Sequence, residues 1–127
     1  MMVKHTILIV EDDEPMRFLL DVLLKTDYDL IFKNDGLAGM KWLSEGNIPS
    51  VIVSDFKTPK MNGFDFFNSI SQSGMFSEIP FVFITNRKEE AFKNRCLALG
   101  AKGYLQKPFD PEQLHEMLDG IFKEIEQ

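Results

Sequence analysis

The chain has 127 residues, of which 44% are apolar, and its 20 acidic and 14 basic side chains give a formal net charge of −6. This is the size of one domain with an ordinary hydrophobic core, and the acidic balance excludes extensive binding to nucleic-acid phosphates, which requires clustered Lys and Arg. The single cysteine excludes a disulfide framework, and no apolar stretch approaches the roughly 18 residues of a membrane span. We therefore expect a cytoplasmic domain that binds neither nucleic acid nor membrane directly.

Short apolar runs alternate with longer segments of helical periodicity along the chain. The runs predict five strands, at 6–10, 28–33, 51–55, 81–85 and 103–106. The periodic segments predict five helices, at about 15–25, 37–46, 64–70, 89–99 and 111–125.

Strands that alternate with helices in this way form right-handed β-α-β units. The sequence therefore predicts a doubly wound α/β domain, with a mainly parallel sheet covered by helices on both faces. In such a sheet the ligand site lies beyond the carboxyl ends of the strands. The residues that follow each strand are therefore the candidates for chemistry.

Charged and hydroxyl side chains end or follow four of the predicted strands. The first strand is followed by the acidic run 11–14, the third ends in Asp55, the fourth ends in Thr85, and the fifth is followed by Lys107. Clustered carboxylates repel each other, and a divalent cation relieves the repulsion. Oxygen ligands without His or Cys favour a hard ion such as Mg²⁺ or Mn²⁺, and Lys107 provides a positive charge suited to a phosphate oxygen.

Each of these residues also has an ordinary structural interpretation. Acids between a strand and a helix often cap the helix, and we expect Asp13 or Glu14 to cap the helix that begins near Pro15. An Asp, Thr or Lys at a strand end is commonly a turn former or a solvated side chain. Because four such positions share one edge of the sheet, coincidence is the weaker explanation.

The sequence resembles the receiver domain of two-component response regulators, with a chemotaxis-regulator-like fold, over essentially its whole length. Four segments carry the resemblance: 7–17 (ILIVEDDEPMR), 51–63 (VIVSDFKTPKMNG), 83–85 (FIT) and 103–109 (GYLQKPF). It implies a flavodoxin-like (βα)5 fold with strand order 2-1-3-4-5. It also implies a single receiver domain over residues 1–127, with no output domain in the chain.

The resemblance also assigns the phosphoacceptor and the metal ligands. It implies that Asp55 accepts the phosphoryl group, that Glu11 and Asp12 hold Mg²⁺ or Mn²⁺ together with Asp55, and that the backbone carbonyl of Lys57 completes the metal site. From the residues alone, the pair could instead be Asp12 and Asp13. Glu11 and Asp12 are preferred because they directly follow the first strand.

The switching residues are implied in the same way. Thr85 and Lys107 contact the phosphoryl group, and Tyr104 is the switch aromatic. Phosphorylation adds negative charge and acceptor oxygens at Asp55, which draws Thr85 inward and opens space for Tyr104 to rotate. The surface of the fourth helix, fifth strand and fifth helix then changes. The family pattern also implies a cis bond between Lys107 and Pro108.

The implied partners are a histidine kinase or histidine phosphotransfer protein as phosphoryl donor, and a downstream protein target. The surface of the fourth helix, fifth strand and fifth helix is a candidate dimer interface. In this role the protein assists its own phosphorylation and dephosphorylation and is not a turnover enzyme.

Three positions depart from the commonest family pattern. Lys57 lies two positions after the phosphoacceptor, Asn86 replaces the usual Ala or Gly, and Asn62 replaces the usual Asp. Asn62 is a mild change, because Asn forms the same turns and caps as Asp. We expect Asn86 to crowd the entrance for phosphodonors, and Lys57 with Arg87 to obstruct the attacking water. The hypothesis that follows is a long-lived phosphoryl group.

Three other functions compete with a phosphorylated receiver. A haloacid-dehalogenase-like phosphatase would use Asp55 as nucleophile, but it needs a second Asp where Lys57 stands. A flavodoxin-like cofactor binder would cradle phosphate after the first strand, where the acidic run 11–14 repels it. The third is a degenerate receiver that acts only as an interaction module, and the unusual residues Lys57 and Asn86 make it the most serious alternative.

Overall fold

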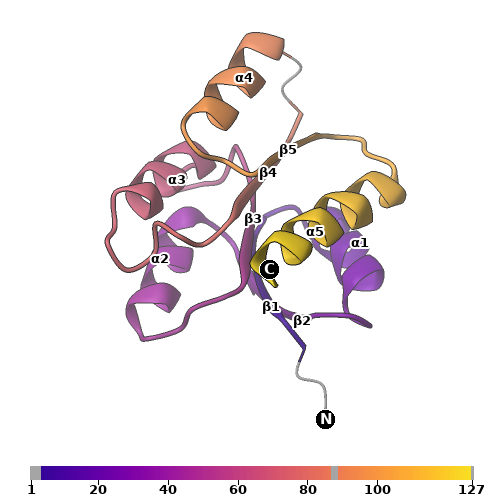
Figure 1. Ribbon diagram of the computed structural model, residues 1–127, viewed down its shortest axis with the longest axis horizontal. Coiled ribbons are helices and arrows are strands. Elements are labelled where there is room, and N and C mark those ends of the chain that lie inside the picture. The colour runs from indigo at the N-terminus through magenta and orange to yellow at the C-terminus, as the bar shows by residue number, and fades with distance from the viewer. Residues whose placement is uncertain (1–3, 87–88, 127) are drawn as a thin grey trace.

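The computed structural model describes residues 4–86 and 89–126, which form one five-stranded parallel sheet and five helices (Figure 1). The strands are β1 (Thr6–Val10), β2 (Asp29–Lys33), β3 (Val51–Asp55), β4 (Phe81–Thr85) and β5 (Gly103–Gln106). The helices are α1 (Glu14–Leu24), α2 (Gly36–Ser44), α3 (Gly63–Ser71), α4 (Glu90–Ala98) and α5 (Pro111–Ile125). The strands lie in the order β2-β1-β3-β4-β5, which confirms the predicted doubly wound fold.

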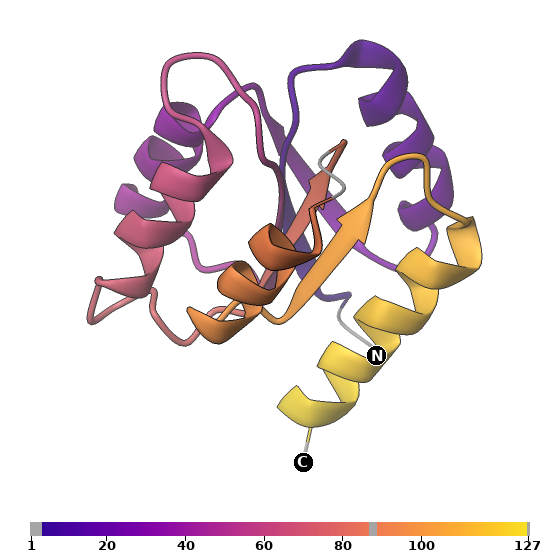
Figure 2. The same cartoon turned by 90° about the horizontal axis from the view of Figure 1, so that it is seen from above.

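The helices form two layers on the sheet. α1 and α5 cover one face, and α2, α3 and α4 cover the other (Figures 1 and 2). Every paired strand is parallel to its neighbours, so all five carboxyl ends point to the same edge. This arrangement brings the residues after the strands together.

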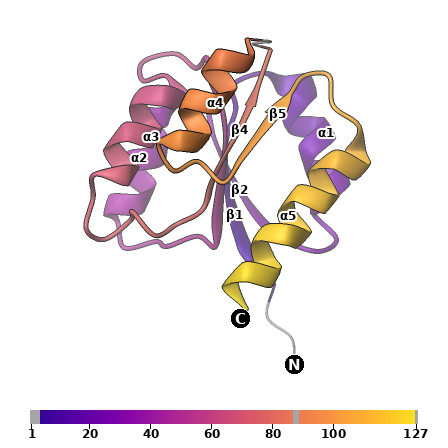
Figure 3. The same cartoon turned by 45° about the horizontal axis from the view of Figure 1, so that its top comes forward.

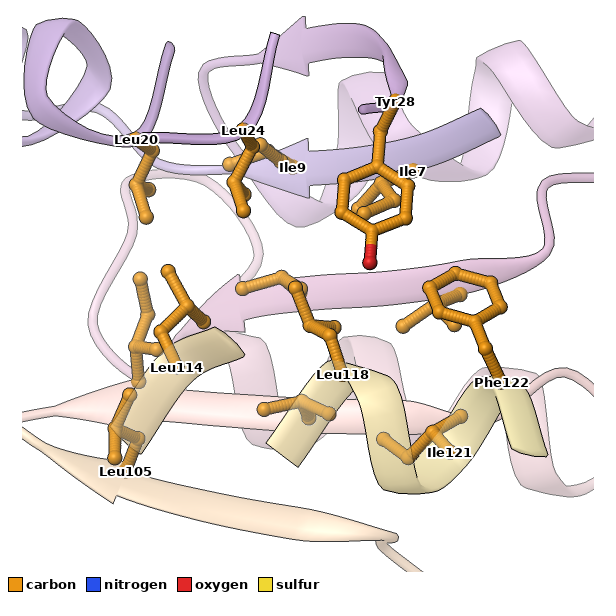
Figure 4. Close-up of a cluster of buried hydrophobic side chains, with 14 residues drawn as sticks. Ile7, Ile9, Leu20, Leu24, Tyr28, Leu105, Leu114, Leu118, Ile121 and Phe122 are labelled. Carbon is orange, nitrogen blue, oxygen red and sulfur yellow. The ribbon is translucent and has the colours of Figure 1, made fainter. Parts of the chain in front are cut away.

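The interior strand β1, which lies between β2 and β3, shows how the apolar runs build both layers. Ile7 and Ile9 point into the core under α1 and α5, which Figure 4 shows, whereas Leu8 and Val10 point into the core under α2 and α3. All four side chains are fully buried. A strand covered on both faces needs apolar residues at every position, which is why β1, β3 and β4 read as continuous apolar runs.

α5 closes the first core through one apolar stripe. Its 15 residues begin with Pro111, and the Asp110 side chain accepts a hydrogen bond from the main-chain N–H of Glu112, in a capping box with Gln113. The buried stripe packs beside α1 on the same face of the sheet (Figure 4) and consists of Leu114, Leu118, Ile121 and Phe122. Among the described residues, no helix combines the length and apolar character needed to cross a bilayer.

The second strand begins one residue later than predicted. Tyr28 lies before β2 rather than in it, and its buried ring stacks on Phe122 with ring centroids 5.2 Å apart. The apolar character of Tyr28 therefore serves packing against α5. Sequence periodicity alone does not separate these two uses of an aromatic residue.

Gly63 connects the fold to the end of β3. Its main-chain N–H donates a hydrogen bond of 2.8 Å to the carbonyl of Phe56, and a Cβ at this position would overlap the carbonyl oxygen of Asp55. Backbone cannot move aside as a flexible side chain can. The chain therefore requires glycine here in order to bring α3 against the end of β3.

We predict that Gly63→Ala lowers the free energy of unfolding by about 2 kcal/mol or more, the typical cost of overpacking a closely packed site. The urea-unfolding midpoint measures the change. Gly74→Ala is the matched control, because a Cβ at Gly74 meets nothing within 4 Å, and its effect should stay within about 0.5 kcal/mol. Equal midpoints for the two variants would contradict the close approach at Gly63.

Candidate functional site

The strand register places the polar strand-end residues side by side. Val10 of β1 pairs with Ser54 of β3, Asp55 pairs with Ile84 of β4, and Thr85 pairs with Gln106 of β5. The residues after β1, at the end of β3 and after β5 therefore meet at one edge. The predicted site is assembled by the parallel register of four strands.

Three carboxylates form a cluster at this edge. Glu11, Asp12 and Asp55 each offer an oxygen atom, and these atoms lie within 4.8 Å of one another. Glu11 is fully buried, Asp55 is partly buried and Asp12 is exposed. Asp13 instead caps α1, because its side chain accepts a hydrogen bond of 3.0 Å from the main-chain N–H of Met16.

Lys107 supplies the positive charge. Its Nζ donates a hydrogen bond of 2.7 Å to Glu11 Oε1 and lies 3.6 Å from Asp55 Oδ2. Its main-chain N–H donates a hydrogen bond of 2.7 Å to the carbonyl of Thr85. The bond between Lys107 and Pro108 is cis, as expected. Lys107 is thus attached to β4 through its main chain and to two carboxylates through its side chain.

The electrostatics of the cluster are only partly balanced. Burial raises the pKa of Asp55, and Lys107 and the main-chain N–H groups of Phe56 and Lys57 oppose this effect without cancelling it. Burial also raises the pKa of Glu11, with a further contribution from Asp55, against the hydrogen bond from Lys107. Three carboxylates and one ammonium group sum to a formal charge of −2 when all are ionised.

This donor set fits a hard divalent cation. The available ligands are carboxylate oxygens, the cluster is open to solvent through Asp12, and a charge of +2 would balance the formal charge of −2. Calcium-like cages use more protein oxygens than the three found here, whereas Mg²⁺ and Mn²⁺ keep several waters. The carboxylates would hold the ion, and the ion would keep Asp55 ionised.

The two residues expected to switch share one face of the sheet. Tyr104 pairs with Phe83 on β4, and both side chains belong to the core on the α2, α3 and α4 side. Thr85 follows Phe83 by two positions and therefore points to the same face. Thr85 is buried and Tyr104 is half-buried. Both side chains thus lie on the α4 side of β4 and β5.

The three departures from the family pattern fall in two places. Lys57 and Asn86, together with Asp55, Phe56 and Thr85, line a cavity of about 320 Å³. Asn62 caps α3 by accepting a hydrogen bond of 2.8 Å from the main-chain N–H of Asp65, as expected of an Asp replacement. Arg87 lies outside the described residues.

Sequence reasoning did not single out Phe56. Phe56 lines the cavity beside Asp55, and its ring lies 4.7 Å from the ring of Phe92 on α4, centroid to centroid. The signal available in the sequence was an aromatic residue directly after the candidate phosphoacceptor. Its partner on α4 is 36 positions away in the chain, and sequence patterns do not reveal such a contact.

Comparisons with known proteins agree with this arrangement. Residues 7–119 match the family profile described as the response regulator receiver domain. The chain is 31% identical over 121 residues to a probable chemotaxis protein CheY of Rhizobium etli, covering 94% of this chain and 93% of that protein. It is similar in structure to the Mn²⁺-bound form of response regulator Rcp1, with a TM-score of 0.78, 32% identity, and coverage of 92% of this chain and 91% of the other.

Another relative is much longer. The chain is 36% identical over 120 residues to histidine kinase P4 of Formosa agariphila. The matched region covers 94% of this chain but only 9% of the kinase. Similar sequences therefore occur both in proteins of this size and as a small part of a large kinase.

The cluster predicts a pH-dependent effect of removing one charge. Without divalent metal, Asp55→Asn should raise the urea-unfolding midpoint near pH 7.5. The reason is that the pKa of the Asp55 carboxyl is higher in the folded protein than in the unfolded chain. As pH rises, the unfolded chain therefore loses the carboxyl proton first. The parent loses stability as pH rises from the unfolded pKa to the folded pKa. The gain should shrink as pH falls to about 4, where the unfolded carboxyl also becomes protonated.

Asp29→Asn controls for the loss of an exposed carboxylate, since Asp29 lies on β2 outside the cluster. A gain for Asp55→Asn that is equally large near pH 4 would contradict burial of the Asp55 charge as its cause.

Proposed function

The chain belongs to the response regulator receiver domain family, and on this premise we propose that it accepts a phosphoryl group onto Asp55 from a histidine kinase or histidine phosphotransfer protein of the cytoplasm. One observation carries the proposal. Asp55 lies at the carboxyl end of β3 with two other carboxylates within 4.8 Å and the ammonium group of Lys107 at 3.6 Å. Phosphoryl transfer depends on positioning and on neutralising the phosphoryl charge, and this arrangement offers a nucleophile, an ammonium group and carboxylate ligands for a divalent cation.

The transfer itself needs little covalent assistance. A carboxylate oxygen of Asp55 attacks the phosphorus of a phosphohistidine, the new P–O bond forms as the P–N bond breaks, and the electron pair passes to the imidazole nitrogen, which takes up a proton. Lys107 stands where its ammonium group can move from Asp55 to a phosphoryl oxygen. The Thr85 hydroxyl is the second proposed contact to the phosphoryl group.

The proposed cofactor is Mg²⁺, with Mn²⁺ as a substitute. Glu11, Asp12 and Asp55 would hold it through their oxygens, and the backbone carbonyl of Lys57 is the fourth proposed ligand. When bound, the ion neutralises charge that develops on the phosphoryl oxygens. Rcp1 has been solved in an Mn²⁺-bound form, which supports a cation of this class.

The proposed output is a change in the surface formed by α4, β5 and α5. Phosphorylation converts the carboxylate of Asp55 into an acyl phosphate that carries about −1.5 to −2 charge and more acceptor oxygens beside Thr85. Movement of Thr85 toward it would release Tyr104 from its present position. A downstream protein, or a second copy of the chain, would bind the altered surface. Moving such an equilibrium from 1:99 to 99:1 requires about 5.5 kcal/mol of differential stabilisation.

A second candidate is a receiver that binds partners without being phosphorylated. Lys57 and Asn86 favour it, since both line the cavity beside Asp55. A turnover phosphatase is disfavoured, because Lys57 occupies the position that a second catalytic acid would need. Phosphorylation of the purified protein separates the two receivers.

Incubation with Mg²⁺ and a small phosphodonor such as acetyl phosphate should increase the intact mass by one phosphoryl group. Asp55→Asn should abolish the adduct, and Asp29→Asn should keep it, because Asp29 lies outside the cluster. No adduct on the parent, together with no Mg²⁺-dependent response to beryllium fluoride, would contradict phosphorylation and leave the binding module.

The cavity residues predict a long phosphoryl lifetime. After removal of the donor, the phosphoryl group should decay severalfold faster in Lys57→Asn and Asn86→Ala than in the parent, because each replacement opens the approach of water to Asp55. Loss of radiolabelled phosphate measures the rate. Asn62→Asp is the control and should decay as the parent does, since Asp also caps α3. Parent-like decay in both cavity variants would refute the role of the cavity.

A further inference from the structure

α4 is attached to the domain differently from the other helices. Among the described residues of α4, Cys96 is the one buried side chain. The N-cap residue Glu89 makes no side-chain cap hydrogen bond, and α4 has no apolar stripe comparable to that of α5. Apolar burial supplies most of the stability with which a helix docks. α4 is therefore held by fewer apolar contacts than α5.

Aromatic ring contacts also attach α4 to the domain. The Phe92 ring of α4 lies 4.7 Å from Phe56 in an edge-to-face geometry, 6.1 Å from Phe64 of α3 and 6.0 Å from Tyr104 of β5. We call these four residues the Phe92 cluster. The guanidinium group of Arg95 adds a contact at 5.4 Å over the Phe64 ring. Figure 3 shows α4 beside α3 and over β4 and β5, where these contacts occur.

Phe56 links this cluster to the phosphoacceptor. It follows Asp55 directly, its N–H donates to the carbonyl of Ile84 at 3.2 Å, and its carbonyl accepts from Gly63 at 2.8 Å. Phe56 also lines the cavity of about 320 Å³ beside Asp55. The backbone of Phe56 is thus held by two hydrogen bonds, the residue borders the site, and its ring contacts Phe92.

Phe92 therefore touches two parts of the proposed switch at once. Phe56 borders the place where a phosphoryl group would lie, and Tyr104 is the proposed switch aromatic. When either ring shifts, the three ring contacts of Phe92 are no longer satisfied together, and α4 is the least firmly held of the elements involved. An aromatic pair has a preferred geometry, so a change in ring position has an energetic consequence.

We propose that Phe92 is a positioning residue that couples the placement of α4 to phosphorylation, through its contacts with Phe56 and Tyr104. This inference rests on the proposed phosphorylation of Asp55 and adds, through Phe56, a route to α4 that does not depend on the Thr85 hydroxyl. Because coupling is reciprocal, a protein bound to α4 would also alter the affinity of the site for its phosphoryl group or a mimic of it.

Hydrogen exchange tests the coupling in the full chain, with Mg²⁺ and beryllium fluoride as the phosphoryl mimic. In the parent, the mimic should change exchange both in α4 (90–98) and in β5 (103–106). In Phe92→Leu, the change in α4 should fall by about 3- to 10-fold, the size of one aromatic pair contact, whereas the change in β5 and the binding of the mimic should persist.

Two variants separate coupling from a general loss of stability. Phe92→Tyr keeps the ring and should respond as the parent does. Phe76→Leu removes a buried ring from the same side of the sheet, outside the Phe92 cluster, and should also leave the α4 response intact. If Phe92→Leu does not fold, Phe56→Leu breaks the same contact from the other side and should show the same loss in α4.

The outcomes are distinguishable. The role of the Phe92 ring would be overturned if Phe92→Leu, or its substitute Phe56→Leu, kept a parent-like α4 response. It would also be overturned if Phe92→Tyr or Phe76→Leu lost the α4 response to the same extent. Either result would leave the proposed function intact. No response to the mimic anywhere in the parent would overturn the proposed function and the coupling together.

Discussion

Electrostatic repulsion among Glu11, Asp12 and Asp55 is the constraint on which the rest of the site depends. The parallel register holds these carboxylates within 4.8 Å of one another, and Lys107 offsets only one of the three charges. An isolated loop would relieve the repulsion by moving apart. Here the apolar strands β1 and β3, which are buried on both faces, prevent that movement. The core thus maintains a site that favours protons or a cation.

The sequence was sufficient to predict the fold because its signals are local and repeated. Continuous apolar runs identified β1, β3 and β4, and the α5 stripe together with Pro111 identified the last helix. The predicted start of β2 was wrong by one residue, because the Tyr28 ring packs on Phe122 and the residue lies outside the sheet. Patterns of this kind report burial, and burial alone does not say which element a residue belongs to.

The candidate site was predictable for a different reason. Its charged residues follow strands, and parallel topology brings strand ends together whatever lies between them in the chain. Two features were beyond this reasoning. Asp13 caps α1, and Glu11 is the residue that joins Asp12 in the cluster, a choice between Glu11 and Asp13 that the residues alone left open. The contact of Phe56 with Phe92 joins the loop after β3 to α4, and the relative placement of these two segments is set by tertiary packing.

The most direct test of this account is the effect of Mg²⁺ on the urea-unfolding midpoint, compared among the parent, Asp12→Asn and Asp13→Asn. We predict that Mg²⁺ at 100 times its dissociation constant stabilises the parent by about 2.7 kcal/mol. Asp13→Asn should gain the same amount, because Asp13 lies outside the cluster and Asn also caps α1. Asp12→Asn should lose most of this gain at the same concentration. An equal gain in Asp12→Asn, or no gain in the parent, would contradict a cation site built from the three carboxylates.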